Sequence, residues 1–457
     1  MSNEARTSTR LSARTVALYA VGSVGTGGYA TLPGLVLTYY LTDNLGVAAL
    51  AAGLIVTAAK IWDVVIDPII GSASDRQLAR TGSRRGFMVV GALSLPLFFA
   101  LTFAVPPAWG PLAGALCVLL AFLGTATAFS LFQVPYVALP AELTDRYDER
   151  TRLLGWRVVV LTAAILLFGA GGPELRRAGP DQVTGYLLMG VVAGLVIGIG
   201  MLIAARTAKT VASPSPASSS AASIPAVLSL REQYAAGVRT LRRSGPFRAL
   251  LGTFVLQALA TGTMLAGAQY VATWVLRSEA AVTIVFLALV GPALVATPAW
   301  TAFARRVGKE RAFAVASAVF TLAAASIVVA AWAPGAWLYV SIAVAGIAYA
   351  GLQSLPMAML PDVISHDERT SGRGQAGTFT GVWTAGETVG FALGATIVAL
   401  TLAATGYVST TAGTTTTQPD AAILGIVLTF SAVPAVVMLL SLLALRRYRL
   451  RRTDIDA

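Results

Sequence analysis

The sequence predicts an all-α integral membrane protein with twelve transmembrane helices in two six-helix bundles. Three observations predict this fold: an apolar composition, twelve long apolar runs, and a polar break near the middle of the chain. Of the 457 residues, 56% are hydrophobic and 12% are charged, and the mean hydropathy is +0.74. Soluble domains average about 45–50% apolar and about 25% charged residues, so this composition indicates a protein that lives in a bilayer.

The apolar runs define the expected helices in order. A helix needs about 20 residues to cross about 30 Å of hydrocarbon. Runs of this length occur at 15–42, 47–75, 86–105, 109–140, 153–172, 183–206, 247–275, 279–304, 311–333, 336–361, 375–406 and 421–446.

The basic residues between the runs predict the orientation. With the N-terminus in the cytoplasm, twelve spans place most of them on one side, as the positive-inside rule demands. This cytoplasmic set comprises Arg76, Arg80, Arg84, Arg85, Arg146, Arg150, Arg152, Arg305, Arg306, Lys309, Arg369, Arg373, Arg446, Arg447, Arg449, Arg451 and Arg452. Arg176, Arg177 and Arg277 fall on the other side. The net charge of +12 is therefore explained by topology, and no nucleic-acid partner is expected.

A polar segment divides the chain into two halves. Residues 207–224 are rich in Ala, Ser and Pro and are typical of a flexible linker, whereas residues 228–243 can form an amphipathic helix with basic residues. We therefore expect an N-terminal bundle at 1–206, a cytoplasmic linker at 207–246, and a C-terminal bundle with a basic tail at 247–457.

An internal repeat indicates that the two halves are duplicates. Val134-Pro-Tyr-Val-Ala-Leu-Pro140, followed by Asp-Glu-Arg-Thr from position 148, recurs as Leu355-Pro-Met-Ala-Met-Leu-Pro361, followed by Asp-Glu-Arg-Thr from position 367. The fourth span thus matches the tenth. Duplicated bundles that enclose a site near the middle of the membrane are typical of secondary transporters.

The second span carries the most informative charges. Lys60, Asp63 and Asp67 are spaced by three and four positions, which places them on one face of a helix. Each charge at bilayer depth costs about 2.5–3.5 kcal/mol, so three together indicate a function, most simply an ion or proton site. The alternative is a structural ion pair that only permits insertion.

The reactive residue types exclude several other functions. The sequence has one cysteine, Cys117, and one histidine, His366, so it offers neither a disulfide nor a histidine metal cluster. It also lacks a nucleophile with an adjacent base. We expect neither an enzyme nor a metal site, and a sensor built on a transporter body is the remaining alternative class.

These residues resemble the major facilitator superfamily and, within it, the glycoside-pentoside-hexuronide:cation symporters typified by the melibiose permease. The most specific match is Lys60-Ile-Trp-Asp63-x3-Asp67-Pro-x2-Gly71, followed by a loop pattern at Gly71-Ser-Ala-Ser-Asp75-Arg76 and Arg84-Arg85. Further matches are Tyr39-Tyr-Leu-Thr-Asp43, Gln133-Val-Pro-Tyr, Leu360-Pro-Asp362-Val and Gly381-Val-Trp383-Thr.

The resemblance implies a cation site at Asp63 and Asp67, completed by the hydroxyl of Ser130. A side-chain amide that helps to bind sodium in the resembling permease is replaced here by Ile66. Sodium needs several oxygen ligands and a proton needs one, so this loss favours proton coupling over sodium coupling. No cofactor is expected beyond this coupling ion, H+ or Na+.

The resemblance to the sugar sites of this family is weaker. The corresponding positions appear here as Thr26, Gly27, Gln133, Val137 and Thr388, which are small, neutral or apolar. The expected substrate-binding residues are Thr26, Tyr29, Lys60, Gln133, Arg157, Trp383, Glu387 and Thr388. We expect a small organic solute such as a glycoside or a less polar amphiphile, and proton-driven efflux of a secondary metabolite or lysolipid-like amphiphile is the alternative.

The resemblance also implies gating charges at the cytoplasmic ends of the spans. The expected gating residues are Gly71, Asp75, Arg76, Arg84, Glu142, Arg150, Asp362 and Arg369, whose charged members would form ion pairs between the bundles in the outward-facing state. The alternative is that these charges, including those near positions 148 and 367, belong to solvated loops. We expect a monomer in the cytoplasmic membrane, with the lipid bilayer and a small-molecule substrate as its partners.

Overall fold

The computed structural model describes residues 11–144, 146–208, 230–371, 376–414, 416–448 and 450. These residues form helices and short connections. An isolated antiparallel β-bridge joins Leu45 to Thr411. The predicted linker at 207–224 lies almost wholly outside the described residues.

The described residues of the first half form seven α-helices and one short 3-10 helix. In order they are α1 (Ala13–Val21), α2 (Ser23–Asp43), α3 (Ala49–Thr81), α4 (Arg85–Thr102), η1 (Pro107–Trp109), α5 (Gly110–Leu143), α6 (Tyr147–Arg177) and α7 (Gln182–Ala205).

The second half has a comparable set of long helices. They are α8 (Leu230–Arg243), α9 (Gly245–Tyr270), η3 (Val271–Val275), α10 (Ala281–Val307), α11 (Lys309–Ser326), η4 (Ile327–Ala331), α12 (Trp337–Ser371), α13 (Ala376–Ala404), α14 (Asp420–Phe430) and α15 (Ala432–Leu445). The amphipathic helix expected at 228–243 corresponds to α8.

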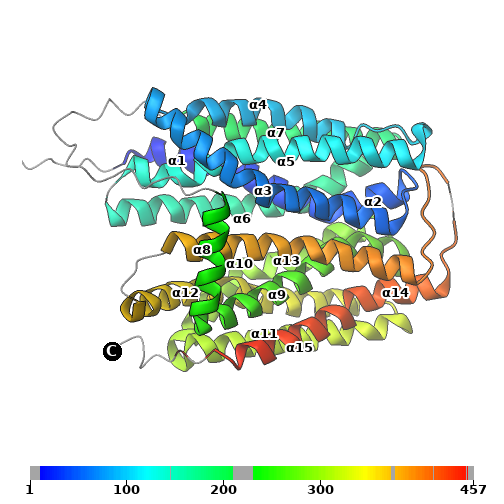
Figure 1. Ribbon diagram of the computed structural model, residues 1–457. Coiled ribbons are helices and arrows are strands. Elements are labelled where there is room, and N and C mark those ends of the chain that lie inside the picture. Colours follow the sequence, from blue (N-terminus) through cyan, green and yellow to red (C-terminus); the bar gives the residue numbers. More distant parts are fainter. Residues whose placement is uncertain are drawn as a thin grey trace, which may run out of the picture.

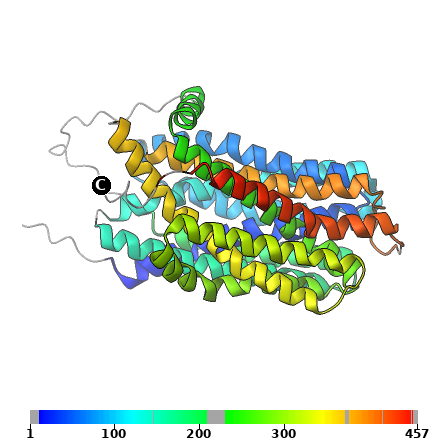
Figure 2. The ribbon, with the colours of Figure 1, turned by 90° about the horizontal axis from the view of Figure 1, so that it is seen from below.

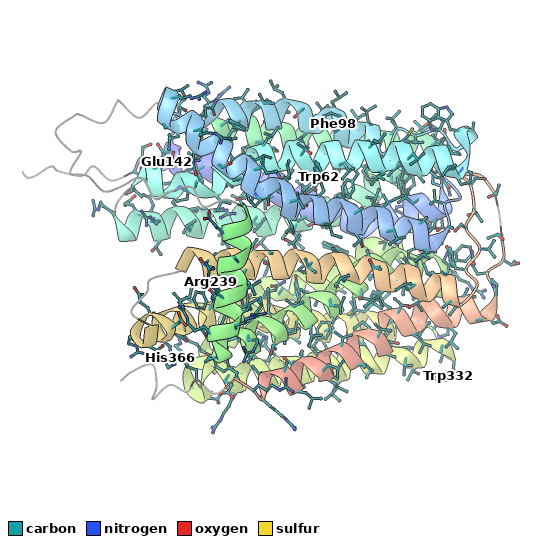
Figure 3. The ribbon with its side chains drawn as sticks, viewed as in Figure 1. Trp62, Phe98, Glu142, Arg239, Trp332 and His366 are labelled. Atoms are coloured by element: carbon teal, nitrogen blue, oxygen red, sulfur yellow. The ribbon has the colours of Figure 1, made fainter. Side chains whose placement is uncertain are left out.

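The two halves lie side by side, with their long helices running in the same general direction (Figures 1 and 2). We call the end at which α3 finishes and α4 starts the terminal end, because the first and last described residues lie there. The opposite end, at which α2 connects to α3, is the far end. Glu142 and His366 lie toward the terminal end, and Trp332 lies toward the far end (Figure 3).

Eleven segments among the described residues are long and apolar enough to cross a membrane. They correspond one by one to the second to twelfth predicted runs. The first predicted run corresponds to α1 and α2, and it is not among the eleven. α2 is rich in Gly, Thr and Tyr, but most of its residues are buried between α6, α7, α9 and neighbouring helices. A helix surrounded by protein does not need an apolar surface.

Two helices extend farther at the terminal end than the sequence indicated. α3 continues to Thr81, so the segment from Gly71 to Arg76, expected to form a loop, is helical. α12 likewise continues to Ser371, beyond the run that ends at position 361. The loop prediction was wrong because charged residues with good helical propensity can prolong a helix into water once hydrophobic packing has formed its earlier turns.

A cluster of contacts joins the halves at the far end. Tyr407 donates a hydrogen bond to Asp43 at 2.6 Å, and the hydroxyls of Thr42 and Tyr270 lie 2.7 Å apart. An ion pair of 3.2 Å connects Arg176 on α6 to Glu279. We call this set the far-end latch.

Closer to the middle of the molecule, α3 packs directly against α13. The hydroxyls of Thr57 and Thr396 are hydrogen-bonded, and Gly53 lies against Ala395 and Ala399. A Cβ at position 53 would clash with α13, so glycine allows the two halves to approach closely here.

Candidate functional site

The middle of α3 brings Lys60 and Asp63 together, as their spacing predicts. Nζ of Lys60 lies 3.1 Å from Oδ2 of Asp63. The hydroxyl of Tyr29, on α2, donates to the same carboxylate, with distances of 3.3 and 3.4 Å to its two oxygens. Asp63 is only 8% exposed, so its charge is compensated by one ammonium and one phenol rather than by bulk water.

Asp67 lies one turn farther along α3 and has a different partner. It forms a side-chain hydrogen bond with Ser130 on α5, and it is close enough to Asp63 and Lys60 to interact with both charges. The side chain of Asp67 is partly exposed, and that of Ser130 is buried. The predicted group of Asp63, Asp67 and Ser130 therefore does lie in one place.

Tyr29 is held firmly at this cluster. Its ring stacks on Phe129 of α5, with ring centres 4.1 Å apart, and the ammonium of Lys60 lies 4.3 Å from the Tyr29 ring centre. A cation at this distance from an aromatic face is attracted to it. Tyr29 thus interacts with both members of the Lys60–Asp63 pair, and the sequence had assigned it to the substrate instead.

A second polar pair lies between α2 and α5. The hydroxyl of Thr26 donates to Oε1 of Gln133 at 2.8 Å. Thr26 precedes Tyr29 by three positions, so both side chains lie on the same face of α2. The structure therefore places two of the expected substrate residues, Thr26 and Gln133, next to each other and close to the charged cluster.

Arg157 takes part in an aromatic cluster that the sequence did not reveal. Its guanidinium lies 5.4 Å from the ring centre of Tyr136, which stacks on Tyr19 with 4.6 Å between ring centres. The Tyr136 hydroxyl donates to the carbonyl of Tyr19 at 2.9 Å and lies 3.0 Å from the Ser23 hydroxyl. The signal was present in the Gln-Val-Pro-Tyr match, but the partners come from α1 and α2.

The expected substrate residues of the second half lie on α13. Trp383 is buried and stacks on Phe254 of α9, with ring centres 4.3 Å apart. Within the described part of the chain, its indole N–H has no hydrogen-bond partner. Glu387 and Thr388 are partly exposed about one turn farther on, and Glu387 lies near Tyr349 of α12.

Among the described residues, no hydrogen bond or ion pair connects these α13 side chains to the Lys60–Asp63–Asp67 cluster. The structure thus divides the expected substrate residues between the two halves. A solute that contacts both sets would lie between the halves.

Four of the expected gating charges, Asp75, Arg84, Glu142 and Asp362, form ion pairs within their own halves. Arg84 contacts Asp75 at 2.6 Å and Glu142 at 2.5 Å. Burial alone would lower the pKa of Arg84, but its hydrogen bonds to Glu142 and Asp75 outweigh this effect and raise it, so the guanidinium stays charged.

In the second half, Lys309 contacts Asp362 at 2.6 Å. Arg150 donates to the carbonyl of Thr144 at 3.1 Å, Gly71 is partly exposed, and Arg76 and Arg369 are exposed on their helices. Pairing between the halves was expected for an outward-facing state, and it stays a prediction for that state.

Two charges that the alternative interpretation assigned to solvated loops are buried on helices. Glu149 is 6% exposed and pairs with Arg152 at 3.3 Å. Asp367 is 5% exposed and pairs with Arg243 of α8. The loop interpretation was wrong because each carboxylate has a basic neighbour, which offsets the cost of removing it from water.

The family model described as MFS/sugar transport protein matches residues 18–452. The chain belongs to this family. A match over nearly the whole chain confirms the resemblance to the superfamily, and relatives named as glycoside/cation symporters agree with the glycoside-pentoside-hexuronide group. As an MFS/sugar transport protein, the chain is a multi-pass transporter of the cell membrane rather than an enzyme.

Two curated relatives align with this MFS/sugar transport protein over nearly their whole length. The uncharacterized symporter sll1374 of Synechocystis sp. is 26% identical, covering 96% of this chain and 94% of its own. The glucuronide carrier protein homolog of Escherichia coli is 25% identical, covering 96% and 93%. The putative glycoside/cation symporter YagG of E. coli is 30% identical over 39% of each chain.

Solved structures share the fold. A bacterial homologue of the human lysosomal transporter Spinster, in an inward-facing and occupied conformation, has a TM-score of 0.66 at 11% identity and covers 97% of both chains. The nucleoside transporter NupG has a TM-score of 0.63 at 12% identity, covering 96% of this chain and 99% of its own. At these identities the likeness supports the fold of an MFS transporter and says nothing of the solute.

Proposed function

We propose that this protein is a proton-coupled symporter of a sugar-like solute, with Asp67 as the group that takes up the coupling ion. One observation carries this proposal: Asp63 is paired with the ammonium of Lys60, whereas the hydroxyl of Ser130 is the hydrogen-bond partner of Asp67 among the described residues. One positive and two negative charges leave the cluster with a net charge of −1. A single monovalent cation would therefore neutralise it.

The cluster suits a proton better than sodium. Sodium requires several oxygen ligands at once, and the ammonium of Lys60 already occupies one face of the Asp63 carboxylate. Ile66, immediately before Asp67, adds no oxygen ligand. A proton needs only one carboxylate oxygen, and Asp67 supplies it.

Neutralisation would couple the ion to the movement of the halves. Moving a net negative charge into a dry interface between two bundles is costly, and a neutral cluster avoids that cost. α3 already touches α13 around Thr57, about one turn from Lys60. We propose that ion uptake lets this contact extend toward the terminal end, which would close that end.

We further propose that this structure is an inward-facing state, with twelve spans and a cytoplasmic terminal end. The far-end latch supports this, because it joins the halves at one end. Orientation follows from charge: the helix ends at Arg80, Arg85, Arg206 and Arg446 lie at the terminal end, where the positive-inside rule places the cytoplasm.

The names of the relatives and the side chains suggest the solute class. Curated relatives are named as carriers of glucuronides, glycosides and sulfoquinovose. Here Thr26 and Gln133 are hydrogen-bonded to each other, so they offer fewer free hydrogen-bonding groups to a hydroxyl-rich sugar. We propose a glycoside with an apolar aglycone, carried by a monomer.

The test is transport by purified protein in proteoliposomes loaded with buffer. A panel of alkyl and aryl glycosides and glucuronides is screened for uptake driven by an inward proton gradient, with sodium absent. We expect concentrative uptake of at least one apolar glycoside, collapse of that uptake by a protonophore, and no stimulation by a sodium gradient. Stimulation by sodium alone would reassign the coupling ion.

Asp67→Asn separates coupling from binding. This variant carries a permanently neutral side chain, so we expect it to exchange solute across the membrane while losing accumulation against a gradient. Asp420→Asn removes an exposed carboxylate at the start of α14 and serves as the matched control. Unchanged accumulation by Asp67→Asn would remove Asp67 from the mechanism. Reversing the proton gradient in the same vesicles tests the alternative function, proton-driven efflux.

A further inference from the structure

A groove lies between α4 and α7 at the terminal end, away from the charged cluster on α3. Its volume is about 320 Å³, and it is lined by two arginines and four aliphatic residues: Arg85, Val89, Ile199, Leu202, Ile203 and Arg206. None of these residues belongs to the proposed ion or solute site. The groove is therefore a separate feature of the first half.

The groove exists because the packing of α4 against α7 changes along the helices. At Gly190, Gly194 and Gly198 the two helices touch closely, and a Cβ at Gly198 would lie 2.9 Å from the carbonyl oxygen of Ala92. This spacing of small residues is typical of close helix contacts in membranes. One turn later the larger Leu202 takes the place of glycine, and it lines the groove.

Two cationic groups stand at the mouth of this groove. Arg85 and Arg206 are exposed, and in the described part of the chain neither guanidinium has a carboxylate partner. The neighbouring Arg84 is the one that pairs with Asp75 and Glu142.

Local hydrogen bonds fix the mouth. The hydroxyl of Ser83 donates to the carbonyl of Ala208 at 2.9 Å and accepts the backbone N–H of Arg85 at 3.2 Å. The start of α4 and the end of α7 are thereby joined, and the two arginines stay on the same side.

The outer surface beyond the groove is apolar. Val90 and Leu93 of α4, and Leu195 and Ile199 of α7, are exposed large aliphatic residues. A helix rises about 1.5 Å per residue, so the strip from Arg206 to Leu195 extends about 16 Å from the arginines toward the far end. Cations at one end of a long aliphatic strip match an amphiphile with an anionic head and an acyl tail.

We propose that this groove binds one anionic phospholipid, with its phosphate between Arg85 and Arg206 and an acyl chain along Val89, Leu202 and Ile199. Arginine forms charge-assisted hydrogen bonds with phosphate, and cationic side chains at the membrane surface attract anionic lipids. The aliphatic bed favours a lipid over a soluble phosphate.

The test measures retained lipid by native mass spectrometry. Purified protein is delipidated and then exposed to phosphatidylglycerol or to phosphatidylcholine with the same acyl chains. We expect one phosphatidylglycerol per chain, bound at least about tenfold more tightly than phosphatidylcholine, and a loss of that preference in R85Q/R206Q. R305Q/R306Q removes two exposed arginines of α10 at the same end and is the matched control, which we expect to keep the lipid.

A steric variant tests the groove itself. Val89→Phe fills the aliphatic bed while leaving both arginines, and we expect it to lose phosphatidylglycerol too; it also keeps the test decisive if R85Q/R206Q folds poorly. Equal binding of phosphatidylglycerol by wild type and Val89→Phe would show that the lipid does not bind in the groove. Equal binding of both lipids, or displacement of the lipid by millimolar inorganic phosphate, would overturn a site for an anionic phospholipid.

Discussion

The ammonium of Lys60 lies 3.1 Å from the carboxylate of Asp63 and 4.3 Å from the ring centre of Tyr29. These three groups form a closed set, because the Tyr29 hydroxyl also donates to Asp63. Within this set, the positive charge of Lys60 compensates the negative charge of Asp63. Within the part of the chain that the structure describes, Asp67, one turn away, forms no ion pair of its own.

Removing one partner of the Lys60–Asp63 pair should destabilise the protein more than removing both. Breaking a largely buried pair leaves an uncompensated charge and costs about 3–5 kcal/mol, whereas replacing both partners with neutral groups costs much less. We expect Asp63→Asn to lower the unfolding midpoint in detergent and Lys60→Met with Asp63→Asn to restore most of it. Thermal unfolding checks this. Equal destabilisation by the single and double variants would show that the pair does not determine stability.

A disulfide between α3 and α13 should arrest the transporter with its far end closed. The hydroxyls of Thr57 and Thr396 are hydrogen-bonded, so thiols introduced at these two positions would lie next to each other. We expect Thr57→Cys with Thr396→Cys, in a Cys117→Ser background, to lose transport under oxidation and to regain it with a reductant. The single Thr57→Cys variant is the control. Transport that survives complete cross-linking would show that the halves do not separate here.

Arg84 should be the main stabilising residue of the terminal end in this state. Its removal leaves Asp75 and Glu142 without their shared cation. The loss of a charged hydrogen-bonding partner costs about 1–3 kcal/mol, so we expect Arg84→Gln to unfold at a clearly lower temperature. Arg80→Gln, an exposed arginine on the same end of α3, should change little. Equal unfolding temperatures for the two variants would contradict this role.

The indole N–H of Trp383, which has no hydrogen-bond partner among the described residues, should donate to the solute. Leaving a buried donor without an acceptor costs free energy, and a bound solute that accepts this hydrogen bond would remove the cost. We expect Trp383→Phe, which can keep the stacking on Phe254, to raise the apparent KM about tenfold, as one lost hydrogen bond of about 1.4 kcal/mol predicts. Transport kinetics and thermal unfolding are measured together. A large loss of stability with an unchanged KM would make Trp383 a packing residue.

Local sequence determined much of this architecture. Hydropathy located each of the eleven segments that could cross a membrane among the described residues, because an apolar run of sufficient length has few other stable environments. The first of the twelve predicted runs is not among these eleven. The spacing of Lys60, Asp63 and Asp67 placed them on one helix face, because helical geometry fixes the angle between neighbouring residues. The repeated proline motif lies on α5 and α12, and their equivalence in the two halves stays a prediction.

Contacts between distant helices came only from the tertiary structure. Tyr407 and Asp43 are 364 positions apart, and the pairing of Arg84 with both Asp75 and Glu142 depends on how α3 and α5 converge. Arg85 and Arg206 line one groove because glycines on α7 let α4 pack closely against it. Hydropathy and helical period report the surroundings of each residue along its own helix, whereas the packing of side chains selects its partners across helices, and that selection pairs Asp63 with Lys60 and Tyr29.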